Sequence, residues 1–286
     1  MQDTITTMFC LCDDFLKANG CRDDAQCRVS TAQVMTTPLV AAAFFGGHLA
    51  LTRRFLFSHG YFKQNLSASR FCRRLHAISK ALWRHWFRLL GEVFVRCNAT
   101  AHYVVDSLPI PACDNIRIKH CKLFAAREKE NYRGCIGGCI GGCIASKRRF
   151  FFGLKVHLLV TGQGEPVEFV LAPGSTADIK AFKSLDLDLP PGSLIHADRA
   201  YTDYGEEDLL LDAAEIVLQP QRKKNSKRPL ALCREFVSKP IRQQVEIAFS
   251  QITNLFPKHI HAVTPNGFVL KVVCFLLAYS FRCLQA

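Results

Sequence analysis

The sequence contains 14 cysteines but lacks the spacings in which cysteines usually bind structural zinc. No two cysteines are separated by two residues, and no cysteine pair is followed by histidines at zinc-finger spacing. The sequence also lacks a basic start followed by an apolar run, so we expect no secretory signal. The spacing thus argues against zinc fingers, and because cysteines of a protein that is not exported stay reduced, we also expect no disulfide framework.

An uninterrupted apolar stretch long enough to cross a membrane is also missing. The most apolar segment, residues 267–284, is broken by Lys271 and Arg282, which leave ten uncharged residues between them. A membrane-spanning helix needs about 20 apolar residues. The segment therefore predicts a buried core helix, and we expect a protein that does not enter membranes.

Acidic residues are scarce in three stretches of a chain whose net charge is +13. Residues 63–97 carry eight Lys or Arg against one acid, residues 116–155 carry ten against two, and residues 217–244 carry eight against one. Residues 156–216 reverse this balance, with twelve acids and three bases. Basic side chains that only keep a protein soluble would give similar totals, but basic blocks around an acidic one favour a polyanion grip around a metal-binding centre.

The first 98 residues have the pattern of helices. Ser67 and Ser79 are suitable N-caps for two short helices that are apolar on one side and basic on the other. The basic sides carry five candidate DNA-binding residues: Arg70, Arg73, Arg74, Arg84 and Arg88. This arrangement resembles a helix-turn-helix, and an ordinary helical bundle with a basic surface fits it equally well.

From residue 101 the pattern changes to short β-branched and apolar runs. They predict strands at residues 103–105, 150–161, 166–171, 194–196 and 216–218. Helical patterns over residues 176–185, about 206–214 and the last part of the chain lie between or after them. This succession indicates a mixed α/β fold. We therefore expect an N-terminal all-helical domain at residues 1–98 and an α/β domain at residues 99–286.

Two aspartates, Asp106 and Asp198, stand where short apolar strands are expected to stop. Strand ends in open α/β sheets gather ligands and catalytic groups, and Mg²⁺ prefers oxygen ligands while keeping several waters. Glu246 is a third candidate because it flanks the apolar face of the late helix. Any one of the three taken alone is better explained as a surface or capping carboxylate. Together they indicate a site for a hard divalent cation.

These residues lie in a series of recognisable motifs. They are Val-Val-Asp106-Ser-Leu-Pro, His-Ala-Asp198-Arg-Ala-Tyr201 and Arg242-x-x-x-Glu246-x-x-Phe-Ser, with Phe-Gly-Leu-Lys-Val-His157-Leu-Leu and Ala-Pro-Gly-Ser-Thr-Ala-Asp178 between them. Over nearly its whole length the sequence resembles bacterial insertion-sequence transposases of the DDE type, most closely the insertion sequence 982 family. The resemblance implies an RNase H-like catalytic core. Its first aspartate would lie on the first strand, its second after the fourth strand, and its glutamate on a later helix.

The resemblance also implies an activity. Asp106, Asp198 and Glu246 would hold two Mg²⁺ ions, for which Mn²⁺ can substitute, and catalyse DNA cleavage and strand transfer at the terminal inverted repeats of an insertion sequence. The partners would be double-stranded DNA, as element ends and as target, and a second copy of the chain, since two ends must be joined. Such a protein would be cytoplasmic and associated with the bacterial nucleoid when bound to DNA. Asp178 and His157 would have supporting roles at most.

Further basic residues are candidate DNA contacts. Arg242 lies four residues before Glu246 and either binds a DNA phosphate or forms an ion pair along the helix. Two loop clusters are candidate backbone contacts or solvated charges: Lys147, Arg148 and Arg149, and Arg222, Lys223 and Lys224.

The sequence departs from the expected family pattern in two respects. Lys239 and Thr253 stand where related transposases often have a tyrosine and a lysine, and a Gly-Cys-Ile-Gly repeat at residues 134–144 is expected to add a loop of eight residues. Loop growth costs little closure entropy, so folding should survive. The repeat motivates an alternative function: a catalytically decayed DNA-binding protein or repressor of the same element. A repair nuclease of the RNase H type has less support from the motifs.

Overall fold

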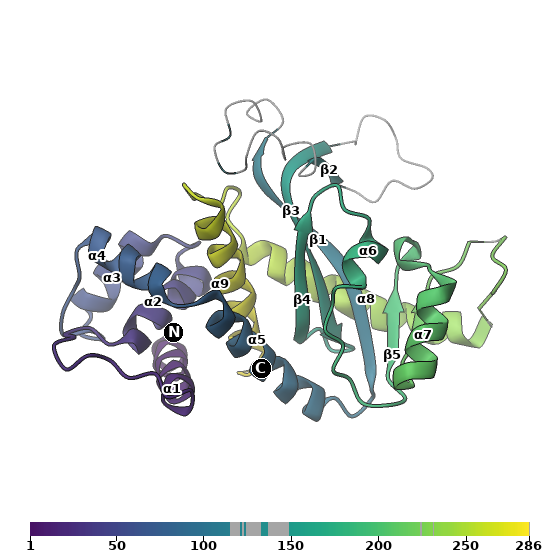
Figure 1. The fold of residues 1–286 in the computed structure, drawn as a ribbon, viewed down its shortest axis with the longest axis horizontal. Coiled ribbons are helices and arrows are strands. Elements are labelled where there is room, and N and C mark those ends of the chain that lie inside the picture. Colours follow the sequence, from purple (N-terminus) through teal and green to yellow (C-terminus); the bar gives the residue numbers. More distant parts are fainter. Residues whose placement is uncertain are drawn as a thin grey trace. The chain divides into compact units, whose positions relative to one another are not determined.

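The computed structural model describes residues 1–114, 121, 123, 133–136, 149–223, 225–230 and 232–285 (Figure 1). Two compact units emerge from this part of the chain. One combines residues 1–87 with residues 254–286, and the other consists of residues 88–253. The predicted functional domains, residues 1–98 and 99–286, divide the chain differently and stay a prediction.

The first unit is helical. Its described helices are α1 (Gln2–Ala18), α2 (Thr31–Phe44), α3 (Leu49–Ser58), α4 (Ala68–Ala77), the start of α5 (Lys80–Cys97) and α9 (Pro265–Cys283). The two predicted caps are present, since the side chain of Ser67 accepts from the backbone of α4 and that of Ser79 accepts from the backbone of α5. The helical character of this region thus agrees with the sequence, whereas its identity as a helix-turn-helix stays a prediction.

Helix α9 forms much of the core of this unit. It has 11 buried residues and packs against α2. Among the described residues α9 is the single helix long and apolar enough to cross a membrane, and 61% of its apolar window is buried inside the protein. Helices α2 and α3 reach that length and apolarity only when they are counted as one span, and the chain bends by 109° between them. The buried-helix prediction for residues 267–284 therefore agrees with the structure.

The second unit is built on a mixed sheet. Its strands are β1 (His102–Asp114), β2 (Arg133–Ile136), β3 (Arg149–Thr161), β4 (Pro166–Pro173), β5 (Leu194–Ala197) and β6 (Val217–Pro220). They are ordered β2-β3-β1-β5-β6, with β4 also paired to β3. Strands β2, β3 and β4 join by antiparallel pairs, as does β1 with β3, whereas β1, β5 and β6 are parallel. The expected α/β class is therefore confirmed.

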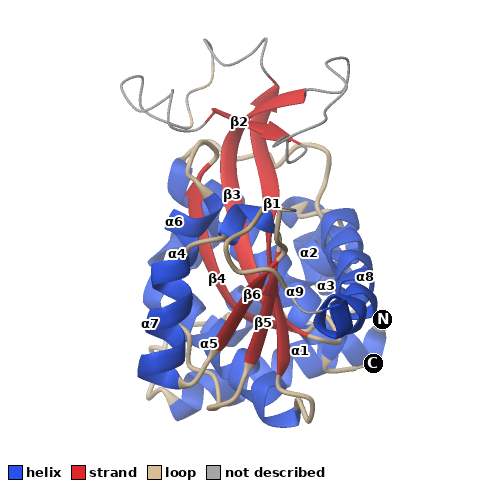
Figure 2. Ribbon diagram, turned by 90° about the vertical axis from the view of Figure 1, so that its right-hand side faces the viewer, coloured by secondary structure: helices blue, strands red, loops and turns tan. Residues whose placement is uncertain are grey.

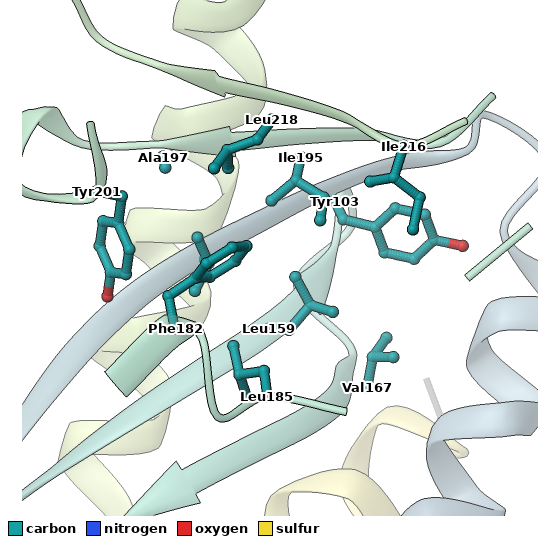
Figure 3. Packing of buried hydrophobic residues seen from close by; sticks show 11 residues of the cluster. Tyr103, Leu159, Val167, Phe182, Leu185, Ile195, Ala197, Tyr201, Ile216 and Leu218 are labelled. Atoms are coloured by element: carbon teal, nitrogen blue, oxygen red, sulfur yellow. The ribbon is translucent and has the colours of Figure 1, made fainter. Parts of the chain in front are cut away.

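Helices cover both faces of this sheet. They are α6 (Asp178–Phe182), the short 3₁₀ helix η4 (Arg199–Tyr201), α7 (Tyr204–Ala214) and α8 (Leu232–Leu255). Figure 2 shows α6 and α7 on one side of the strands and α8 on the other. On the α6 side the rings of Tyr103, Phe182 and Tyr201 pack with aliphatic residues of the strands (Figure 3). Each such fully buried side chain contributes about 1.5–3 kcal/mol, so this cluster fixes the sheet against its helices.

The end of β1 differs from the prediction. The sequence suggested that the strand stops at Asp106, but β1 continues through Pro109 and Pro111 to Asp114. It does so because β3 pairs with it along this whole length. On its other edge no described strand pairs with β1 beyond Val105, where β5 ends. Proline is tolerated on such an unpaired edge because no ladder hydrogen bond needs its missing N–H.

Candidate active site

Asp106 and Asp198 are brought together by the register of two parallel strands. Val105 of β1 is the partner of Ala197, the last residue of β5. The residue that follows each of them in the chain is one of the two aspartates, so Asp106, which lies within β1, and Asp198, which directly follows β5, lie next to each other. Both side chains are partly buried. The parallel pairing of β1 and β5 thus brings these two carboxylates together, and their role as site residues stays a prediction.

Asp106 is the more perturbed of the two. The pKa of its carboxyl is raised to about 6, chiefly by burial and in smaller part by the nearby charge of Asp198. The N–H of Ser107 donates to Asp106 Oδ1 at 2.7 Å and Arg242 lies near enough to act in the opposite direction, but neither outweighs the burial. The fold therefore keeps the Asp106 carboxyl in surroundings that disfavour its charged form.

Asp198 is oriented by the short helix that follows it. Its Oδ1 accepts from the N–H of Ala200 at 2.7 Å, which makes it the N-cap of η4. Burial raises the pKa of Asp198, and the charge of Asp178 adds to this effect. The cations Arg242 and Lys155 lower the same pKa. The carboxylate is thus fixed in place between acidic and basic neighbours.

The structure adds a third aspartate to this neighbourhood. Asp178, in the first turn of α6, pairs with Lys155 of β3 at 2.9 Å between Nζ and Oδ1, and both side chains are 18% exposed. Its charge raises the pKa of both Asp106 and Asp198. The family resemblance implies a supporting role at most for Asp178. The Ala-Pro-Gly-Ser-Thr-Ala-Asp178 motif was the signal that could have placed it here.

Two buried aromatic side chains lie beside the aspartates. Nδ1 of His157 and the hydroxyl of Tyr201 are 3.1 Å apart, and both residues are fully buried. Burial lowers the pKa of His157 to about 4, so the imidazole is neutral at neutral pH. Burial and the charges of the three aspartates raise the pKa of Tyr201. This hydrogen bond ties β3 to η4, and so to the turn that carries Asp198.

Arg242 connects helix α8 to the end of strand β5. Its Nη1 donates to the carbonyl oxygen of Ala197 at 3.0 Å. Glu246 lies one helical turn further along and is exposed. In the described part of the chain no three His, Cys, Asp or Glu side chains are close enough to hold a metal ion together. The structure thus brings Asp106 and Asp198 together but does not add Glu246 to them.

The candidate DNA-binding arginines of the helical region differ in their surroundings. Arg70, Arg73 and Arg84 are exposed. Arg74 is partly buried and pairs with Asp23 at 3.1 Å. In the sheet unit Arg88 pairs with Asp186 at 2.8 Å.

The two loop clusters are described only in part. Arg222 forms two hydrogen bonds with Glu207, and both side chains are less than 9% exposed, so this guanidinium is engaged inside the unit. Lys223 is exposed. Lys147, Arg148 and Lys224 lie outside the described residues, as does the side chain of Arg149 and most of the repeat at 134–144.

A comparison with protein families matches residues 99–281 to the transposase DDE domain. No curated protein and no solved structure matches the chain. The matched domain implies an enzyme that acts on DNA, and enzymes of this kind generally use divalent metal ions. The match starts at residue 99, just before β1, and includes Asp106, Asp198 and Glu246.

Proposed function

Because the chain belongs to the family of transposase DDE domains, we propose that it cleaves and joins DNA at the terminal inverted repeats of an insertion sequence. One observation carries the proposal: Asp106, within β1, and Asp198, directly after β5, each follow one member of a pair of partner residues on neighbouring parallel strands, Val105 and Ala197. The motifs around them support membership of the insertion sequence 982 family within this larger family. The strand order, in which Asp106 lies on the first strand and Asp198 follows the fourth when the short β2 is set aside, supports an RNase H-like core.

The two aspartates fit a divalent cation. Both carboxylates are partly buried, and each lies close enough to other aspartates to be disfavoured in its charged form. A cation bound between them would relieve this repulsion. Mg²⁺ requires only one or two carboxylates when water and substrate phosphate supply its other oxygens. Two Mg²⁺ or Mn²⁺ ions bound here would supply activation of a water or DNA 3′-hydroxyl and stabilisation of the leaving oxygen.

Glu246 is proposed as the third carboxylate. Residues four apart on a helix lie on the same face, about 6 Å from each other. Arg242 contacts the carbonyl of Ala197, the residue before Asp198, so Glu246 lies about one turn from that point. Its exposure leaves it available to complete the site when DNA and metal are bound.

Arg242 is proposed to serve DNA and protein at once. A guanidinium has five N–H donors, and the contact with Ala197 is the hydrogen bond that the structure shows for it. Its remaining donors lie beside Asp198 and suit a phosphate next to the scissile bond. Lys223 and the exposed arginines of α4 are proposed to contact the DNA backbone further away, in a homodimer that holds two ends.

A strand-transfer assay tests the proposal. The full chain is incubated with Mg²⁺ and duplexes that carry the inverted repeats flanking its gene. Asp106→Asn, Asp198→Asn and Glu246→Gln are each compared with Asp208→Asn, a control that removes an exposed carboxylate from α7. We expect the first three to lose at least a hundredfold in joining and the control to lose less than twofold. Strand transfer by Asp106→Asn at the wild-type rate would show that the site is wrong.

A second candidate function rests on the repeat at 134–144. If the inserted residues obstruct the DNA channel, the chain binds element ends without joining them and acts as a repressor. In that case deletion of residues 137–144 restores strand transfer to an inactive full-length chain. An inactive deletion variant would exclude the repeat as the cause.

A further inference from the structure

The helical unit contains a groove that no motif indicated. A pocket of about 550 Å³ lies between the turn that joins α2 to α3 and the segment 257–261. A second pocket of about 260 Å³ borders α4. The two pockets form one continuous groove because they share five lining residues: Gly47, Leu49, His261, Lys271 and Phe275.

The groove is lined by basic and neutral groups. Besides apolar residues, the larger pocket is lined by His48, Lys258, His259, His261 and Lys271, and by no acidic residue. The sequence around it explains why. Residues 25–87 contain nine Lys or Arg, residues 254–286 contain three, and neither range contains an Asp or Glu. The charge of the groove is thus uncompensated along the chain segments that form it.

Lys271 is a cation of the groove without a neighbouring carboxylate among the described residues. It is partly buried, and its ammonium donates to the carbonyl oxygen of His261. Burial lowers the pKa of Lys271, and no carboxylate among the described residues offsets that burial. A cation that is partly desolvated without a counter-charge is stabilised when an anion binds beside it.

The first turn of α3 adds to the positive electrostatic potential of the groove. Leu49 and Ala50, its first two residues, line the larger pocket. Backbone N–H groups at these positions have no partner within a helix. They reinforce the attraction for a negatively charged group that the lysines and histidines already provide.

We propose that this groove binds phosphates of the backbone of duplex DNA. The inference rests on the proposed function. The positive charge of the groove is complementary to a polyanion, and DNA, the proposed substrate, is a polyanion. The groove also adjoins the predicted DNA-binding helix: Cys72, Leu75 and His76 of α4 line its smaller pocket, and the same helix carries the exposed Arg70 and Arg73. The groove extends the DNA-binding surface to Lys258 and Lys271.

Fluorescence anisotropy with a labelled 30-base-pair duplex of arbitrary sequence tests the groove. The full chain is compared with Lys258→Gln, Lys258→Glu and Lys271→Met over a range of salt concentrations. Lys17→Gln is the matched control, because Lys17 is an exposed lysine of the same unit that pairs with Asp13. One lost phosphate contact lowers the salt slope by about 0.9 and weakens binding about fivefold near 0.15 M salt. We expect this loss in Lys258→Gln, a larger loss in Lys258→Glu and none in the control.

The outcomes separate the groove from the proposed function. If the wild-type chain does not bind duplex DNA even at low salt, the proposed function itself fails. If it binds and the Lys258 variants equal the control, the groove proposal is overturned while the function stands. Tighter binding of single-stranded RNA, lost in the same variants, would also overturn it. Because Lys258 is exposed, its variants keep the test valid even if Lys271→Met does not fold.

Discussion

Replacing Asp106 with asparagine removes a charge that the fold holds at a cost. The pKa of this carboxyl rises from 3.8 to about 6 on folding, chiefly through burial. A difference of about two pKa units corresponds to about 3 kcal/mol. Asparagine has nearly the same shape and can still accept the N–H of Ser107 that Asp106 accepts at 2.7 Å. In metal-free protein, Asp106→Asn should therefore be more stable than the wild type by up to about 3 kcal/mol at pH 8.

The sign of the effect sets its pH window. Since the folded state of the wild type binds a proton more tightly than the unfolded state, wild-type stability falls as pH rises from about 4 to about 6 and then levels off. The advantage of Asp106→Asn should be absent below pH 4, grow across this interval and stay constant above it.

Urea unfolding in the presence of EDTA, repeated from pH 4 to pH 8, measures this difference. Asp208→Asn is the control, since the pKa of Asp208 is lowered by its hydrogen bond with Arg228 and the substitution removes no buried charge. Adding Mg²⁺ should stabilise the wild type and leave Asp106→Asn unchanged, because the variant lacks a ligand. Equal stabilities of variant and wild type at pH 8 without metal would refute the reasoning.

Three other substitutions test the surroundings of the site. Tyr201→Phe leaves the buried Nδ1 of His157 without its partner at 3.1 Å. It should lower the free energy of unfolding in urea by about 1–3 kcal/mol and slow strand transfer. Unchanged stability and an unchanged rate would count against a role of Tyr201 in positioning the turn that carries Asp198. Gly91→Ala would place a Cβ 2.1 Å from a carbonyl oxygen of β4, so we expect a fall in melting temperature of several degrees, and an unchanged value would contradict this packing. Arg222→Gln breaks a buried pair with Glu207 and should destabilise the chain by about 3–5 kcal/mol. If the variant instead keeps wild-type stability but its DNA affinity depends less steeply on salt, Arg222 contacts a phosphate.

Local patterns were sufficient for most of the fold. The apolar run at residues 150–161 and the caps at Ser67 and Ser79 correspond to β3, α4 and α5. The length of β1 could not be obtained this way. Proline often ends a strand. Here the long partner β3 holds one edge of β1, and on the other edge no described strand pairs with Pro109 or Pro111, so β1 continues through both.

The candidate site could be predicted where one strand register decides it. Asp106 and Asp198 each follow a short apolar run, and a parallel pair then places them together. The Lys155–Asp178 pair depends on α6 packing beside β3, which no local pattern reveals. Charge content also cannot separate an arginine buried against an acid, such as Arg222, from an exposed one, such as Arg73.

The pairing of Val105 with Ala197 has a consequence for how the site tolerates change. The gap between the two aspartates is a property of the backbone, because neighbouring strands lie about 4.8 Å apart whatever side chains they carry. Substitutions in the surrounding core can therefore alter stability while the two carboxylates keep their separation. An insertion or deletion of a single residue in β5 acts in the opposite way. It would shift the register of β5 by one residue and turn Asp198 to the other face of the sheet, so the number of residues in β5 is constrained more tightly than their identity.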